Sequence, residues 1–357
     1  MLPDLSYPAS TEDWRRLAAR SLPRFLFDYI DGGASGERTL AANVQDFAAL
    51  RLRQRVLVDV AEVDTRATLA GQPCALPLAL APVGLAGMAA RRGEAQAARA
   101  AHAAGVPFTL STVGICPISE VAAAADAPPW FQLYMLRDRG AVRALLDGAW
   151  AAGCRTLVFT VDLPLPGMRL RDIRHGMAAS GARPALIRAA QVLARPGWVR
   201  DVALRGQPLR FGNLTAQVPG ARDLGAFKAW VDAQFDPSVT WQDIDWLRGQ
   251  WKGRLLLKGI LDVHDAQAAV QVGADGASST AWPRPPPSCP PSPRPWARRP
   301  RCWWTAACAA AWMCSRPWPW GRAACSSAVP GCGRWRRRAR RACAPCWPSG
   351  SASCCWQ

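Results

Sequence analysis

The chain has 357 residues, with 44 Lys and Arg against 26 Asp and Glu, a formal net charge of +18, and half of its residues are hydrophobic. This length and apolar content exclude a disordered chain and a disulfide-stapled miniprotein, and they suit one large domain or two ordinary ones. Met1–Asp13 is too polar for a signal peptide, and Leu76–Ala90, the most apolar stretch, contains two prolines and is too short for a membrane span.

Short apolar runs alternate with helical patterns over the first 276 residues. The apolar runs predict strands at Leu76–Ala81, Pro107–Ser111, Phe131–Tyr134, Thr156–Val161 and Leu255–Lys258. The Ala-rich segments between them predict helices at Gly93–Ala104, Arg139–Ala152 and Val263–Val272. A glycine follows each helix, as is typical of helix C-termini: Gly105, Gly153 and Gly273. Alternation at this spacing favours an α/β fold with a parallel sheet.

Polar residues gather where these strands end. They are Ser111, Thr112, Gln132, Tyr134, Thr160, Asp162 and Lys258. A (β/α)₈ barrel builds its active site at this edge, although periodicity alone does not separate a barrel from an open sheet. The interval 175–240 breaks the rhythm and is rich in Arg, Pro and Gly, which predicts a long excursion between barrel elements.

Seven segments carry a specific resemblance. They are FLFDYIDGGA (Phe25–Ala34), LALAPVGLAGMAARRGE (Leu78–Glu94), PFTLSTVGICPISEV (Pro107–Val121), WFQLYMLRDRG (Trp130–Gly140), TLVFTVDLPLPGMRLRD (Thr156–Asp172), FDPSVTWQDIDWL (Phe235–Leu247) and LLLKGILDVHDA (Leu255–Ala266). In this order they resemble the FMN-dependent α-hydroxy-acid dehydrogenases and oxidases, and within that family the respiratory L-lactate dehydrogenases.

The resemblance implies a (β/α)₈ TIM barrel with an N-terminal helical segment at about residues 8–50. FMN is expected across the carboxyl-terminal mouth of the barrel, where it takes a hydride equivalent from a 2-hydroxy acid. The implied reaction is oxidation of L-lactate to pyruvate, with electrons passed to a quinone or cytochrome. Glycolate and mandelate are the alternative substrates within the family, and members commonly form homo-oligomers.

The resemblance also assigns residues to the cofactor. The expected FMN contacts are Pro82, Val83, Gly84, Ser111, Gln132, Thr160 and Lys258. A cation at Lys258 would stabilise the negative charge that develops when the flavin is reduced. The alternatives are strand-end capping for Ser111 and Thr160, and a lysine that extends to solvent from a strand end for Lys258.

Other positions are implied to hold the substrate and carry the reaction. Arg169 should pair with the substrate carboxylate, and Arg171 is the alternative. Tyr29 and Tyr134 should donate hydrogen bonds to substrate oxygens, whereas the alternative for both is aromatic core. Asp162 should orient a catalytic histidine, so Tyr134, Asp162 and Lys258 form the implied catalytic set.

The last 81 residues, 277–357, have a composition unlike that of a folded domain. They contain 13 Arg with no Lys, Asp or Glu, and they hold 10 of the 13 Cys, 10 of the 18 Trp and 14 of the 31 Pro. They contain no Leu, Ile, Phe, Tyr, Asn or His. The first 276 residues carry the remaining charge of +5, from 31 basic and 26 acidic residues.

A shifted reading frame explains this tail. When each codon takes the third base of one residue and the first two bases of the next, Ala277–Trp282 permits Q-L-D-G-V and Ser288–Ser292 permits L-P-A-I. Cys302–Cys308 permits L-V-D-G-G-V, and Ala311–Gly321 permits L-D-V-L-K-A-L-A-L-G. Four coherent segments in one frame and in order predict that residues 277–357 are translated out of frame and are disordered.

The frame change removes the expected catalytic base. The family's S-N-H-G-G-R stretch precedes Q-L-D-G, and about nine codons are missing between Gly276 and that point. The histidines present are His102, His175 and His264, and of these only His175, after the TVD motif, is a candidate substitute. We therefore expect residues 1–276 to form an incomplete barrel domain, and the chain as written to be inactive.

Two other interpretations of the tail remain. Its Arg and Trp residues are compatible with binding to nucleic acid or anionic lipid. Its cysteines suggest zinc, but Cys343–Cys346 is an isolated pair and the tail has no histidine. The frame interpretation implies neither a nucleic-acid partner nor a metal site.

Three cysteines in the coherent part, Cys74, Cys116 and Cys154, suit a reducing compartment. Arg183–Arg210 interleaves basic and apolar residues and could lie on anionic lipid, whereas an ordinary surface loop is the alternative. We expect a cytoplasmic protein that lies peripherally on the inner membrane.

Overall fold

The computed structural model describes residues 7–49, 51–52, 54–165, 167–177, 181–215, 233–279 and 301–304. Apart from 277–279 and 301–304, the tail that we interpret as out of frame lies outside these residues. Part of the 175–240 interval also lies outside them.

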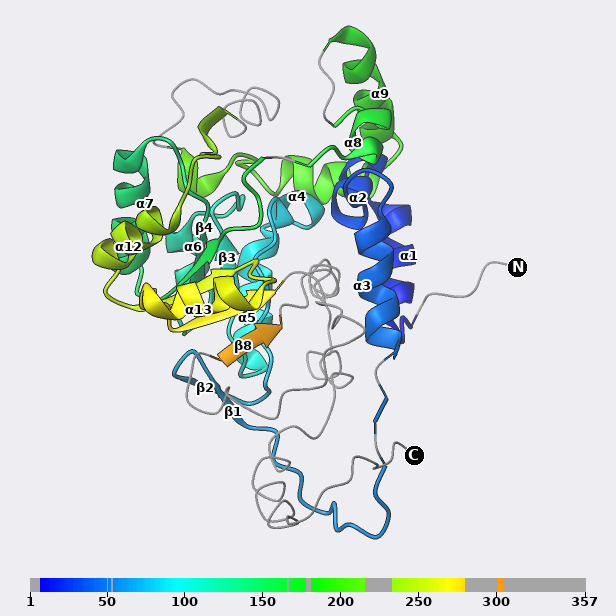
Figure 1. Ribbon diagram of the computed structural model, residues 1–357. Helices are drawn as coiled ribbons and strands as arrows, with labels where there is room; N and C mark the ends of the chain where they lie inside the picture. Colours follow the sequence, from blue (N-terminus) through cyan, green and yellow to red (C-terminus); the bar gives the residue numbers. More distant parts are fainter. Residues whose placement is uncertain are drawn as a thin grey trace, which may run out of the picture.

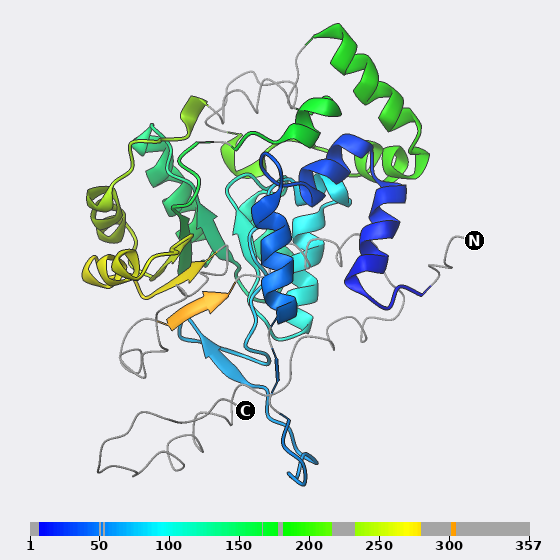
Figure 2. The same cartoon turned by 45° about the vertical axis from the view of Figure 1, so that its right-hand side comes forward.

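Three helices open the described chain: α1 (Thr11–Ser21), α2 (Arg24–Asp31) and α3 (Arg38–Ala49). Helix α1 begins with a capping box, in which the Ser10 hydroxyl accepts from the Asp13 N–H and the Asp13 carboxylate accepts from the Ser10 N–H. These helices stand on the side of the molecule where α5 (Gly93–Ala103) lies (Figures 1 and 2).

A small antiparallel hairpin follows, formed by β1 (Ala67–Leu69) and β2 (Gln72–Cys74). Leu69 and Cys74 are buried with Trp130, Val158 and Leu256 in a second apolar cluster. The side-chain Oε1 of Gln72 accepts from the indole N–H of Trp130 at 2.8 Å. Because Trp130 begins its strand, the hairpin lies at the amino-terminal ends of the main sheet strands.

The main sheet is entirely parallel, in the order β3-β4-β5-β6-β7-β8. Its strands are β3 (Thr109–Ser111), β4 (Trp130–Leu133), β5 (Thr156–Thr160), β6 (Arg254–Lys258), β7 (Gly276–Ser279) and β8 (Arg301–Trp304). A parallel bridge between Leu80 and Phe108 continues the order beyond β3. Strands β3, β4 and β5 are buried at every position, which requires cover on both faces.

The predicted strands and helices are confirmed within one or two residues, except that the first strand is reduced to the Leu80 bridge. The connecting helices are α4 (Ala86–Ala89), α5, α6 (Ile118–Ala124), α7 (Arg139–Ala151), α12 (Trp241–Gln250) and α13 (Val263–Gln271). Gly105, Gly153 and Gly273 have φ of +64°, +89° and +79°. They thus end their helices in the left-handed conformation that the sequence predicts.

The excursion between β5 and β6 is largely helical where it is described. It contains α8 (Leu170–Arg174), α9 (Ala182–Leu193), α10 (Pro196–Trp198), η1 (Val199–Leu204) and η2 (Gly212–Leu214). Helix α9 projects from the body of the molecule in both views (Figures 1 and 2). Trp198 anchors the excursion, because its buried indole N–H donates to the Met88 carbonyl at 2.8 Å. No helix in the described part of the chain is long and apolar enough to cross a bilayer.

Replacing Gly273 with Ala should lower the free energy of unfolding by about 1 kcal/mol, because a Cβ strains a backbone at φ +79°. The new Cβ would meet only Arg248 side-chain carbons, at 3.6 Å or more, so the loss is conformational. The matched change Gly148→Ala lies within α7 with nothing within 4 Å, and should raise stability by about 0.5–1 kcal/mol. Urea titration measures the free energy of unfolding of both variants. Equal changes in the two would contradict the role of Gly273 as a left-handed helix terminus.

Candidate active site

A row of buried polar side chains crosses the carboxyl-terminal ends of β3, β4 and β5. Ser111 and Gln132 are paired residues of adjacent strands, and the Ser111 hydroxyl donates to Gln132 Oε1 at 2.9 Å. Gln132 Nε2 in turn donates to Thr160 Oγ1 at 3.1 Å. All three are buried, so each bond offsets the cost of removing a polar group from water. Gln132 retains hydrogen-bonding capacity beyond this row, since an amide group can make four such bonds.

Lys258 and Asp162 continue this edge. Lys258 ends β6 and pairs in register with Thr160. Its ammonium lies 3.4 Å from Asp162 Oδ1 and 3.5 Å from Oδ2. Gly259 follows with φ +108°, and a Cβ there would lie 2.5 Å from the Asp162 Cβ. The glycine is therefore required for the lysine and the aspartate to approach each other.

The backbone at Pro82-Val83-Gly84 forms a close wall beside this row. A Cβ at Gly84 would lie 2.9 Å from Val113 Cγ2 and 3.2 Å from the Tyr29 hydroxyl. The Leu85 N–H donates to the Val113 carbonyl, and the Val113 N–H donates to the Ser111 hydroxyl. The structure thus brings the Pro82–Gly84 turn, Ser111 and the Tyr29 hydroxyl to one place.

Tyr134 lines a cavity of about 440 Å³ at the ends of β5 and β6. Thr160, Leu163, Phe235 and Trp241 also line this cavity. The Tyr134 ring packs against Phe235 with centroids 4.8 Å apart. Burial raises the pKa of the Tyr134 hydroxyl, and Tyr29 and Asp162 raise it further. The hydroxyl therefore stays protonated at neutral pH and can act as a hydrogen-bond donor.

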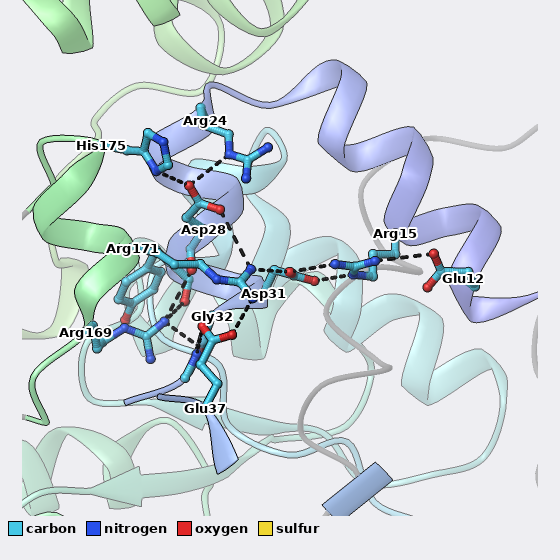
Figure 3. Close-up of polar contacts among 12 residues, drawn as sticks. Glu12, Arg15, Arg24, Asp28, Asp31, Gly32, Glu37, Arg169, Arg171 and His175 are labelled. Carbon is cyan, nitrogen blue, oxygen red and sulfur yellow. Dashed lines mark hydrogen bonds and ion pairs between the residues drawn. The ribbon is translucent and has the colours of Figure 1, made fainter. Parts of the chain in front are cut away.

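Arg169 lies at the end of α2. Its Nη2 donates to the Tyr29 carbonyl and, at 2.9 Å, to the Gly32 carbonyl, while Nε pairs with Asp172 at 2.9 Å (Figure 3). Its guanidinium lies over the Tyr29 ring, 5.2 Å from the centroid. Arg169 therefore serves as a C-terminal cap for α2. Of the three nitrogens of this guanidinium, Nη1 is the one that makes no hydrogen bond to a described residue.

The other end of α2 is also capped from the excursion. Pro23 occupies the N-cap position and contributes no side-chain hydrogen bond. Instead, Gln191 of α9 accepts from the Phe25 N–H at 2.8 Å. The helix that carries Tyr29 has eight residues, which is too short to be stable in isolation. Arg169, which precedes α8, and Gln191 of α9 therefore hold this helix in place.

A network of ion pairs reinforces this contact. Arg171 pairs with Asp31 at 2.7 Å and with Glu37 at 2.5 Å, and Arg15 of α1 pairs with the same Asp31 carboxylate (Figure 3). The alternative role for Arg171 as the substrate's carboxylate partner has no support in this arrangement. The network joins α1 and α2 to α8, which is distant from both in sequence.

Asp28 is the fully buried charge of this region. Arg24 donates to its carboxylate at 2.9 Å, and His175 Nδ1 lies 2.5 Å from the same oxygen (Figure 3). The His175 ring therefore lies directly against the Asp28 carboxylate. His175 is thus engaged with Asp28, and the structure gives no support to it as the substitute base beside Asp162.

Sequence reasoning missed two buried acids, Asp28 and Glu94. Glu94 is 1% exposed and accepts from the Ile115 N–H at 2.8 Å, which fixes the loop after β3. Both lie inside motifs that resemble the family, FLFDYIDGGA and ARRGE. An acid next to apolar residues was the available signal, but Ile115 lies 21 positions from Glu94, and His175 lies 147 positions from Asp28.

Comparison with known proteins decides the family. The model of the FMN-dependent dehydrogenase family matches residues 18–278. The chain belongs to this family. It is 58% identical over 268 residues to an L-lactate dehydrogenase of Caulobacter sp. (strain K31), a match that spans 75% of this chain and 70% of the relative. An L-lactate dehydrogenase of Alcaligenes faecalis is 53% identical over the same shares.

Solved structures agree with this assignment. The structure of the monotopic membrane protein (S)-mandelate dehydrogenase matches with a TM-score of 0.69 and 32% identity, over 77% of this chain and 72% of that one. A mandelate oxidase structure with (S)-4-hydroxymandelic acid matches with a TM-score of 0.62 and 34% identity, over 75% and 69%. The predicted TIM barrel is therefore the fold class of this FMN-dependent dehydrogenase, although the described sheet does not close. The chain is a flavoprotein oxidoreductase whose family cofactor is FMN.

Replacing Asp31 with Asn should lower the free energy of unfolding at pH 7 by about 1–3 kcal/mol, because Arg15 and Arg171 lose a buried partner. Burial opposes ionisation of Asp31, but hydrogen bonds from the two arginines outweigh it and hold its pKa below the usual value. The carboxylate therefore stabilises the fold above its unfolded-state pKa, and this contribution disappears as the pH falls through its folded-state pKa.

Urea titrations should accordingly show the difference from wild type shrinking below about pH 4. Asp64→Asn is the control, because the Asp64–Arg66 pair is exposed and should contribute about 0–1 kcal/mol. A difference for Asp31→Asn that is constant down to pH 2 would contradict the role of the ionised group.

Proposed function

We propose that this gene encodes an enzyme that oxidises L-lactate to pyruvate with FMN. The observation that carries the proposal is the buried Ser111–Gln132–Thr160 row beside Lys258 and Tyr134, within a chain of this family. The choice of substrate rests on the relatives named L-lactate dehydrogenase, which are 52–58% identical, whereas the mandelate enzymes are 30–34% identical. Mandelate and glycolate remain the alternative substrates.

The residues present fit the ring portion of FMN. Gln132 has donors and acceptors to spare at a buried edge, and Gly84 lets the backbone approach Val113 and the Tyr29 hydroxyl closely. Bound FMN supplies an acceptor for the hydride equivalent from C2 of the acid. Ser111, Gln132 and Thr160 would hold the ring edge by hydrogen bonds, with the Pro82–Gly84 backbone on one side. The Lys258 ammonium would stabilise the negative charge that develops when the flavin is reduced. Because its position is already fixed, it would not have to reorganise during the reaction.

Tyr29, Tyr134 and Arg169 are proposed to hold the substrate. Burial raises the pKa of both tyrosines, so both hydroxyls are protonated donors for carboxylate and hydroxyl oxygens. Arg169 uses Nε and Nη2 within the protein, which leaves Nη1 for the substrate carboxylate. The cap on α2 and the carboxylate contact then depend on one side chain.

Asp162 is proposed to orient the catalytic base. The family's histidine falls in the codons missing after Gly276, and His175 is held by Asp28. Residues 1–276 are therefore proposed as the enzyme domain, and the chain as written as inactive. A quinone or cytochrome as electron acceptor and a homo-oligomeric state remain proposals from the family resemblance.

A frame-restored chain with the missing codons supplied should be yellow, and its flavin absorbance should bleach anaerobically with L-lactate. The chain as written, incubated with FMN, should show no bleaching, because it lacks the base. Bleaching rates should be at least ~10-fold higher with L-lactate than with (S)-mandelate, a difference of about 1.4 kcal/mol in barrier. Faster bleaching with mandelate or glycolate would reassign the substrate, and none with any 2-hydroxy acid would overturn the function.

We further propose that the protein lies peripherally on the cytoplasmic face of the inner membrane, through α9 and η1. Leu186, Leu193 and Leu204 are 71%, 78% and 69% exposed on this projection, and Arg183 and Arg210 are exposed beside them. Exposed apolar side chains among cations suit an anionic lipid surface. The structural relative described as a monotopic membrane protein supports this location.

The change Leu186→Glu with Leu193→Glu should therefore reduce co-sedimentation with anionic vesicles by about tenfold, through lost apolar burial and added repulsion. Binding by wild type should weaken as salt is raised. Val60→Glu, at a site that is 70% exposed away from α9, is the control and should bind like wild type. Equal loss in both proteins would point to a different contact surface.

A further inference from the structure

The segment that precedes α12 covers the ring of Tyr134. It comprises residues 233–240, which we call the cover segment, and its Phe235 ring lies 4.8 Å from the Tyr134 ring, measured between centroids. Phe235, Pro237 and Val239 also line the cavity of about 440 Å³ that Tyr134 faces. One wall of this cavity therefore depends on where the cover segment lies.

The backbone of the cover segment pairs only briefly with the residues that follow β4. The pairing is an isolated antiparallel bridge. The Arg137 N–H donates to the Gln234 carbonyl at 2.8 Å. The Asp236 N–H donates to the Met135 carbonyl at 3.2 Å. So short a pairing is marginal in water, which means that side chains must help to hold the segment.

Arg139, in the first turn of α7, provides the side-chain contact. Its Nη2 lies 2.8 Å from Asp236 Oδ2 and 2.7 Å from Asp243 Oδ1. Asp236 belongs to the cover segment and Asp243 to α12, and α7 and α12 lie side by side in both views (Figures 1 and 2). The Asp236 side chain is only 7% exposed. Removing Arg139 would therefore leave a shielded negative charge without its cation.

Both carboxylates are shared between Arg139 and the cover segment. Asp236 accepts from Arg139 on Oδ2, and from the Ser238 N–H and hydroxyl on Oδ1 at 3.0 and 2.6 Å. Asp243 accepts from Arg139 on Oδ1, and from the Thr240 N–H on Oδ2 at 2.9 Å. Burial opposes the ionisation of both acids, but these hydrogen bonds outweigh it and hold both pKa values below the usual range. Arg139 thus binds two ionised groups at neutral pH.

We propose that Arg139 is a positioning residue for Tyr134. By binding Asp236 and Asp243 together, it holds the cover segment against the tyrosine ring and fixes one wall of the cavity. Arg139 is not among the described residues that line the cavity, so it acts through the cover segment. The consequence for catalysis rests on the proposed function, in which the Tyr134 hydroxyl donates a hydrogen bond to the substrate.

Nitration by tetranitromethane, which attacks the ionised form of tyrosine, tests this proposal on the full chain as written. Peptide mass spectrometry separates the three tyrosines, Tyr7, Tyr29 and Tyr134. Burial raises the pKa of Tyr134, so at about pH 8 it should react slowly compared with Tyr7, which is 87% exposed. Arg139→Gln should increase the rate at Tyr134 at least ~10-fold, because a more exposed hydroxyl has a lower pKa. The rate at Tyr29 should stay unchanged.

Arg143→Gln is the matched control. Arg143 lies one turn further along α7, and its guanidinium is 5.6 Å from the Trp246 ring, against 6.0 Å for that of Arg139. Among the described residues it is not a partner of either carboxylate, so this variant should react like wild type. Arg139→Lys keeps the charge but loses the Nη1 donor to the Leu136 carbonyl, and should give an intermediate rate.

An unchanged rate at Tyr134 in folded Arg139→Gln would overturn the proposal. An equal increase at Tyr29 and Tyr134 would overturn it as well, since Arg139 would then stabilise the fold in general. If Arg139→Gln does not fold, Asp236→Asn decides, because it removes the charge with little change in shape. Asp236→Asn should likewise increase the rate at Tyr134, and a wild-type rate there would contradict the proposal.

These measurements need neither FMN nor a 2-hydroxy acid. Failure of L-lactate to bleach the flavin of the frame-restored chain would overturn the proposed function and leave the positioning role intact. A wild-type nitration rate at Tyr134 in Arg139→Gln would overturn the positioning role alone, so the two failures are distinguishable.

Discussion

A parallel sheet places the carboxyl ends of all its strands at one edge, and the candidate site depends on this constraint. Ser111, Gln132, Thr160 and Lys258 come from four separate strands, yet strand register alone makes them neighbours. The same constraint demands a crossover after every strand, because parallel strands cannot be joined by a tight turn. An interruption late in the chain therefore leaves the earlier strands paired and the barrel unclosed. The polar row on β3 to β6 is formed without the later strands.

The substrate side of the site has a different physical origin. Tyr29 lies on a short helix outside the barrel, and its position is determined by charges and caps that other segments provide. Asp28 and Asp31 are removed from water and compensated by cations from α1, α2 and α8. Unpaired buried carboxylates would be strongly destabilising, so the network specifies one arrangement of these elements. The site thus combines residues fixed by strand register with a helix that is held in place by ion pairs.

Local patterns allowed much of this fold to be predicted. Apolar runs and glycines such as Gly153 act through nearby backbone, so strands and helix ends could be located from the sequence. The resemblance brought together the residues of the polar row. The cap that Arg169 makes on α2 and the pair between His175 and Asp28 could not be predicted, because they join residues more than 130 positions apart. Val56 and Val60, between α3 and β1, are exposed in the structure, although apolar side chains are usually buried.

The side chains that cap the two ends of α2 both come from outside the helix. Gln191 satisfies one end and Arg169 the other, and both belong to the stretch that runs from the end of β5 into α9. Eight residues do not make a stable helix alone, so detaching that stretch removes the conditions for α2 to exist. We therefore expect the two to open together, at a lower free energy than the sheet. The position of Tyr29 therefore depends on a surface excursion far along the chain.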